Sequence, residues 1–299
     1  MPRSCWISIT LALAACSSIS QQSGSPHDFA AIVDAGYAPP EGVQPFDIVL
    51  DLGDLLGSTD PLERDEWAYG ISAQWIVRRG LLAPDELREL ALRWCENLRV
   101  GLGEKDRDSV FLRSFSALSL SLIAARDLQQ PFLDANEVRA LVDRALEYAA
   151  RERDRRDFDP VHGWIHATAH TADWLKFLAR NRHVDAARLR AMLDAVGGMI
   201  AGDAVRAYSM GEDERLARAL AAVVAREELD PRAWCGFLDA LVELVARTRA
   251  QGFSETGFAV EQNVLHVLRA LYASLSAADG SPEHVQLARD ATLRALARL

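Results

Sequence analysis

Helical spacing of apolar residues runs through most of the chain and constrains its fold more than any other feature. From residue 46 onward, apolar side chains recur every three or four positions, and no segment alternates convincingly with the two-residue period of a strand. Proline follows a capping residue at four expected helix starts: Asp60-Pro61, Asp159-Pro160, Asp230-Pro231 and Ser281-Pro282. The sequence therefore predicts an all-α fold.

The expected helices are numerous and closely spaced. They cover residues 46–57, 61–79, 84–101, 108–127, 135–152, 161–180, 185–201, 212–228, 231–250, 257–276 and 282–298. Short connections make neighbouring helices antiparallel. We therefore expect one domain over residues 46–299, built of stacked antiparallel helix pairs as an α/α superhelix or α-solenoid. No fixed sequence period indicates an established repeat family.

The N-terminus has the features of a bacterial lipoprotein signal. Arg3 precedes a short apolar run, Trp6–Ala15, and Leu13-Ala14-Ala15-Cys16 resembles a lipobox. We expect residues 1–15 to be a signal peptide, Cys16 to be lipidated, and residues 16–45 to contain a flexible tether rich in Ser, Gln, Gly and Pro. An ordinary secretory signal is the alternative. Ser17 after the cysteine favours the outer membrane, with the domain facing the periplasm.

Charge and missing motifs exclude several classes of function. The net charge of −10 opposes nucleic-acid binding. The sequence has no glycine-rich phosphate loop, Gly-x-Ser-x-Gly elbow, Cys-x-x-Cys pair or His-Glu-x-x-His motif, so it implies no nucleotide cofactor. Cys95 and Cys235 could form a disulfide in the periplasm, but their spacing favours two unpaired, buried cysteines.

The segment HGWIHATAHTAD, residues 162–173, carries the main candidate site. On an α-helix with about 100° per residue, His162, His166, His170 and Asp173 share a face about 80° wide. Imidazole and carboxylate groups converging in this way suit a divalent metal such as zinc, manganese or iron. The alternative is a hydrogen-bonded polar network in the core.

Three further charged residues are candidates for catalytic or binding roles. Arg113 lies in an apolar helix over residues 110–125, where a buried guanidinium needs a partner such as Asp173. Asp65 and Glu212 lie in first turns of expected helices, where acids also favour the helix dipole. In the functional interpretation, these helix starts converge on one polar pocket with the histidines.

At these residues the chain resembles the domain of unknown function 2785 family. The resemblance rests on Arg64-Asp65-Glu66, Ala68-Tyr69, Val110-Phe111, Arg113–Leu118, Gly163-Trp164, His166-Ala167, Ala169-His170, Asp173 and Glu212–Leu216, within residues 46–250. It implies a helical domain and no established activity, so it assigns no catalytic residues. The lipoprotein signal departs from the mostly soluble chains of that family.

Two hypotheses for function follow. The first is a lipid-anchored binding module for an envelope protein, peptide or glycan, with a polar His/Asp/Arg pocket. The second is a metal-dependent hydrolase in which His166, His170 and Asp173 hold the metal. Asp65 or Glu212 would then act as general base, and Arg113 would stabilise developing negative charge.

Overall fold

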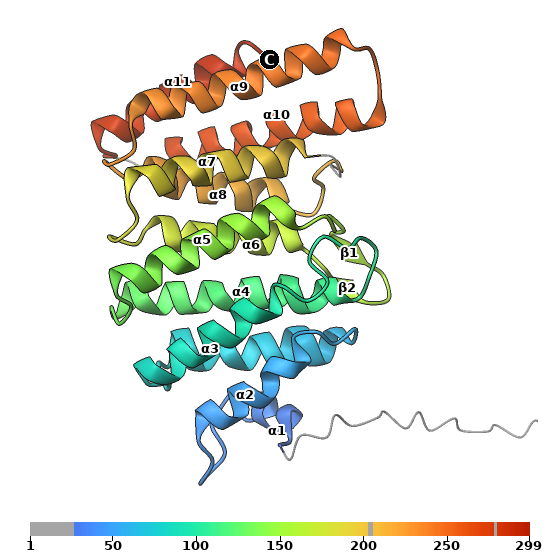
Figure 1. The fold of residues 1–299 in the computed structure, drawn as a ribbon, viewed down its shortest axis with the longest axis vertical. Coiled ribbons are helices and arrows are strands. Elements are labelled where there is room, and N and C mark those ends of the chain that lie inside the picture. Colours follow the sequence, from blue (N-terminus) through green and yellow to red (C-terminus); the bar gives the residue numbers. More distant parts are fainter. Residues whose placement is uncertain (1–26, 203–205, 278–279) are drawn as a thin grey trace, which may run out of the picture.

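The computed structural model describes residues 27–202, 206–277 and 280–299. Its helices stack along the long axis, from α1 and α2 at one end to α9 and α11 at the other (Figure 1). The all-α fold of stacked helix pairs predicted from the sequence is confirmed. The expected signal peptide and Cys16 lie outside the described residues.

Even-numbered and odd-numbered helices form two layers. The even layer places α4 (Ser109–Gln129), α6 (Ala167–Ala179), α8 (Glu212–Val224) and α10 (Glu255–Ser276) side by side in that order. The odd layer contains α3 (Pro84–Asn97), α5 (Ala135–Arg151), α7 (Ala186–Ala201), α9 (Pro231–Ala250) and α11 (Glu283–Leu296). Because each pair returns the chain to its starting edge, the even helices all begin at the same edge of the stack.

The N-terminal end of the stack contains shorter elements. Helix α2 (Pro45–Leu55) packs on the π-helical segment η1 (Leu62–Ile71), and a second π-helical segment, η2 (Gln74–Arg78), packs on α4. Single π-helical turns are uncommon and often occur near functional sites. Here η1 and η2 replace the regular α-helix that we expected over residues 61–79.

Helix α4 lies at the centre of the packing. It contacts α3, α6 and η2, and most of its side chains are buried. Within the described ranges it is the one helix long and apolar enough to cross a membrane, but its burial against these neighbours accounts for its apolar character.

The start of α6 differs from the sequence prediction. The expected helix over residues 161–180 begins only at Ala167, because the preceding residues form a small antiparallel hairpin of β1 (Phe158–Asp159) and β2 (Gly163–Trp164) (Figure 1). Gly163 has φ +71°, and a Cβ there would lie 3.0 Å from Pro61. His166 also adopts a left-handed φ of 50°, so the chain cannot enter a right-handed helix before Ala167.

The packed domain begins earlier than predicted. A short helix, α1 (Phe29–Asp34), lies within the expected tether, and Asp28 caps it by accepting from the backbone N–H of Ala31. Phe29 and Ile32 are buried, and the indole of Trp75 donates to the Tyr37 carbonyl at 2.8 Å. Residues 28–37 therefore pack on the domain, because two apolar side chains anchor a segment that composition alone assigned to the tether.

The two cysteines of the domain are unpaired, as the sequence favoured. Cys95 is partly buried, and burial raises the pKa of its thiol to about 12. Cys235 is exposed on α9, so the prediction that both cysteines are buried is wrong for this residue.

Candidate functional site

His166 and His170 lie together at the start of α6. Their rings meet edge to face with centroids 5.8 Å apart. They do not share the face of a continuous helix, because His166 is the residue before the first helical position and His170 lies one turn further. A left-handed non-glycine residue such as His166 is uncommon, and such conformations concentrate at functional sites.

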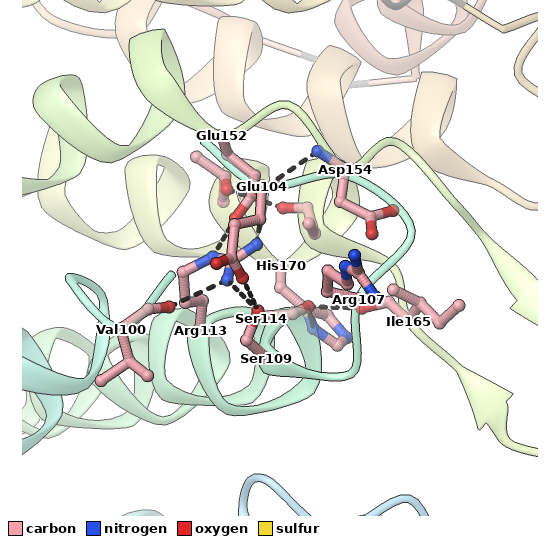
Figure 2. A network of polar contacts seen from close by, with 12 residues as sticks. Val100, Glu104, Arg107, Ser109, Arg113, Ser114, Glu152, Asp154, Ile165 and His170 are labelled. Carbon is pink, nitrogen blue, oxygen red and sulfur yellow. Dashed lines mark hydrogen bonds and ion pairs between the residues drawn. The ribbon is translucent and has the colours of Figure 1, made fainter. Parts of the chain in front are cut away.

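The hydrogen bonds of His170 define its tautomer (Figure 2). The hydroxyl of Ser114 contacts both the Ile165 carbonyl and Nδ1 of His170, the latter at 2.8 Å. Because a carbonyl only accepts, the single hydroxyl hydrogen is donated to Ile165, and Nδ1 of His170 donates to the Ser114 oxygen. Nε2 of His170 then keeps its lone pair, and it has no hydrogen-bond partner among the described residues.

His166 has the opposite tautomer. Its Nε2 lies 3.2 Å from the Met210 carbonyl and therefore donates to it, which leaves Nδ1 with the lone pair. The ring stacks on Trp164 with centroids 4.4 Å apart. Burial, reinforced by the charge of Arg215, lowers the pKa of His166. Burial also lowers the pKa of His170, with smaller contributions from His166 and Arg215. Both imidazoles are thus held neutral at pH 7.

Asp173 follows on the next turn of α6 and is neutralised by two cations. Its Oδ1 accepts from Nζ of Lys176 at 2.7 Å, and its Oδ2 pairs with the guanidinium of Arg215 on α8. The Asp173 side chain is 6% exposed, so both ion pairs are shielded from solvent on the carboxylate side. Arg113, the partner suggested by the sequence, is not in contact with it.

Glu212 completes the group at the first residue of α8. Its Oε2 accepts from the Met210 backbone N–H at 3.0 Å, and its Oε1 lies 3.8 Å from Nε2 of His166. Burial raises the pKa of this carboxyl. We call His166, His170, Asp173, Glu212 and Arg215 the histidine cluster.

His162 lies outside this cluster. It occupies the hairpin turn, where its Nδ1 is 3.1 Å from Oδ1 of Asp159. Its backbone carbonyl accepts from the buried guanidinium of Arg64 at 2.7 Å, and that guanidinium also lies over the Phe111 and Phe115 rings. His162 thus joins the hairpin to η1 through its backbone.

Asp65 is paired with its neighbour Arg64, at 3.1 Å from Nε to Oδ1. Burial raises the pKa of Asp65 to about 6, although the charge of Arg64 acts in the opposite direction. Asp65 makes no direct contact with either histidine of the cluster.

Arg113 belongs to a separate structural network (Figure 2). Its guanidinium makes two bonds to Glu152, Nε–Oε2 at 2.6 Å and Nη2–Oε1 at 3.0 Å, and also donates to Ser109 and to the Val100 carbonyl. The side chains of Arg113 and Glu152 are 0% and 1% exposed. With its hydrogen-bonding capacity used in this way, Arg113 ties α4 to the end of α5.

A groove of about 560 Å³ lies beside the histidine cluster, between η2, α4, α6 and α8. Asp173 and Arg215 belong to both the cluster and the groove. We call it the cationic groove because five cations line it: Arg78, Lys176, Arg180, Arg215 and Arg218.

The described residues do not present an assembled metal centre. Across the parts of the chain that the structure describes, no three His, Cys, Asp or Glu side chains form a group that could hold a metal ion. The geometry explains this result, because the carboxylate of Asp173 is already bound by Lys176 and Arg215.

Several residues of the site were not singled out from the sequence. Ser114, Lys176 and Arg215 each contact a predicted site residue directly. One signal was present for Arg215, which lies three residues after Glu212 and so occupies the same side of α8. No comparable sequence signal pairs Ser114 with His170, since 56 positions separate them.

Fold and site together define an all-α protein of stacked helix pairs with a buried, charge-paired histidine cluster. The family described as "Protein of unknown function (DUF2785)" matches residues 98–273, and the chain belongs to this family. The matched region contains the histidine cluster and Arg113, whereas Arg64 and Asp65 precede it. Neither the curated proteins nor the solved structures include a significant match to this chain.

Proposed function

We propose that this chain is a lipid-anchored envelope protein whose helical domain binds a ligand at the histidine cluster and the adjoining cationic groove. The environment of Asp173 carries the proposal. Its carboxylate is neutralised by Lys176 and Arg215 in the groove wall, and the neutral imidazoles of His166 and His170, within two turns before it in the chain, keep one lone pair each. Such convergent polar groups beside a partly apolar groove are typical of ligand sites.

The same environment favours binding over metal-dependent hydrolysis. A metal held by His166, His170 and Asp173 would have to displace Lys176 and Arg215 from the carboxylate. Arg113 is also committed to Glu152, so it cannot stabilise charge that develops at the histidines. The binding function needs no such rearrangement.

The anchor is proposed from the N-terminal sequence. The basic residue, the apolar run and the lipobox-like Leu13-Ala14-Ala15-Cys16 support removal of residues 1–15 and lipidation of Cys16. Ser17 supports the outer membrane, with the domain in the periplasm. The ligand would then be a molecule of the envelope.

Cell fractionation and metal analysis of the full-length chain test the lipid anchor and the choice between binding and metal-dependent hydrolysis. We expect the wild-type protein in the membrane fraction, released only by detergent, because acyl chains on Cys16 insert into the bilayer. The detergent extract is expected to hold far less than one equivalent of zinc, manganese or iron. Cys16→Ser is expected to move the protein to the soluble fraction.

Cys5→Ser is the matched control, because Cys5 lies in the expected signal peptide and its loss should leave the membrane fraction unchanged. Equal solubility of wild type and Cys16→Ser would refute the anchor. One equivalent of metal that disappears in His166→Ala/His170→Ala would make the hydrolase the better function.

A further inference from the structure

The cationic groove has a charge opposite to that of the protein as a whole. The chain carries a net charge of −10, yet five cations line this groove, and Asp173 is the one carboxylate among its lining residues. One of the chain's two lysines, Lys176, is among them. A concave surface of one sign attracts ligands of the other sign.

Ion pairs within the protein neutralise only part of this positive charge. Asp173 pairs with Lys176 and Arg215, and Glu214 pairs with Arg218 at 2.9 Å. Two carboxylates therefore face five cations. Within the described residues, neither Arg78 nor Arg180 has a carboxylate partner, so both guanidiniums can bind an incoming anion.

Part of the groove lining is apolar. Helix α4 contributes Leu118, Leu122 and Ala125, and α6 contributes Phe177. The cations come from three elements that border the groove. Arg78 lies on η2, Lys176 and Arg180 lie at the end of α6, and Arg215 and Arg218 lie on α8. A ligand in the groove would place an apolar part on α4 while its charged group meets the guanidiniums.

We infer that the cationic groove binds a small amphiphilic anion that joins a phosphate, or a similar group with two negative charges, to an apolar body. This inference rests on the proposed binding function and names its ligand class. Guanidinium groups bind phosphate through paired hydrogen bonds, and an excess of cations favours a dianion over a single carboxylate. The volume of about 560 Å³ lies within the range of small-molecule sites.

The burial of the apolar lining residues of α4 argues for a free ligand rather than for a bilayer surface. A membrane would need the apolar side chains at the outer surface, where they could enter lipid. Here Leu118, Leu122 and Ala125 are buried, whereas Arg78 and Arg180 are exposed. The groove thus fits a molecule that enters it singly.

Isothermal titration calorimetry with a matched series of probes tests this inference. The full-length chain would be held in phosphatidylcholine nanodiscs, with empty nanodiscs as the blank. We expect hexyl phosphate to bind with one equivalent per chain and at least tenfold more tightly than inorganic phosphate. Hexanol is expected to show no binding, and added salt is expected to weaken hexyl phosphate binding because it screens the arginines.

Variants locate the binding site. Arg78→Gln/Arg180→Gln is expected to weaken hexyl phosphate binding by at least tenfold, because it removes the two groove guanidiniums that have no carboxylate partner among the described residues. Arg232→Gln, which changes an exposed arginine on α9 away from the groove, is expected to have no effect.

Three results would overturn the inference. They are unchanged hexyl phosphate binding in the double variant, binding of inorganic phosphate that is equally tight, and competition by phosphatidic acid within the nanodisc, which would assign the groove to a membrane lipid. None of these results concerns the metal content of the protein. They are therefore distinguishable from failure of the proposed binding function, which one equivalent of histidine-bound metal would indicate.

Discussion

Replacing Glu152 with alanine is expected to lower the free energy of unfolding by about 3–5 kcal/mol, because it leaves the guanidinium of Arg113 buried without its counter-charge. Both side chains are almost completely inaccessible, and the two bonds between them join α4 to the end of α5. Urea denaturation followed by circular dichroism measures the loss.

Two controls separate the buried charge from the loss of a side chain. Glu89→Ala breaks an exposed pair with Arg93 and is expected to cost about 0–1 kcal/mol. Arg113→Met/Glu152→Met removes both charges and is expected to recover much of the stability that Glu152→Ala loses. A loss below 1 kcal/mol for Glu152→Ala would show that Arg113 does not depend on this partner.

His170→Gln is expected to flatten the dependence of stability on pH. Burial lowers the pKa of His170 in the folded protein below its ordinary value of 6.5. Below about pH 6.5 the unfolded chain therefore binds a proton that the native state excludes, and the wild-type protein loses stability as the pH falls. One such proton contributes at most about 1.4 kcal/mol for each pH unit.

Urea midpoints of wild type and His170→Gln between pH 7.5 and 5.0 measure this difference. The raised pKa values of Asp65 and Glu212 act in the opposite direction, since these carboxyls take up protons more readily when folded. Both proteins contain these carboxyls, so the difference between the two slopes isolates His170. Val264→Ala, a buried change on α10, should lower stability yet keep the wild-type slope. Equal slopes for wild type and His170→Gln would contradict the account.

The fold was predictable because its signals are local. An Asp-Pro pair marks the start of α9 at Pro231, and the N-cap side chain of Asp230 accepts from the backbone N–H of Arg232 as expected. The same kind of signal failed at Asp159-Pro160, because the following Gly163 and His166 adopt left-handed conformations that only the tertiary structure explains. Helix α1 was missed because two buried residues, Phe29 and Ile32, decide its packing.

The site was predictable only in part because its contacts join distant segments. Helical spacing correctly suggested that His166 and His170 approach each other, although the backbone that achieves this is not a continuous helix. Spacing could not indicate that Asp173 pairs with Arg215, 42 residues away, or that Arg113 pairs with Glu152. Several acidic residues of the sequence could pair with each arginine. Only the packing of the two helix layers determines which of them does.

The central claim is that the two histidines are neutral, hydrogen-bonded parts of a ligand site and not metal ligands. Histidine ¹⁵N NMR of the full-length chain at pH 7.5 tests this claim most directly. The account predicts that His170 is protonated at Nδ1 and that His166 is protonated at Nε2. It also predicts that one equivalent of zinc leaves both sets of resonances unchanged. Zinc-dependent shifts of both histidines at one equivalent, absent in His170→Gln, would contradict it and restore the metal centre.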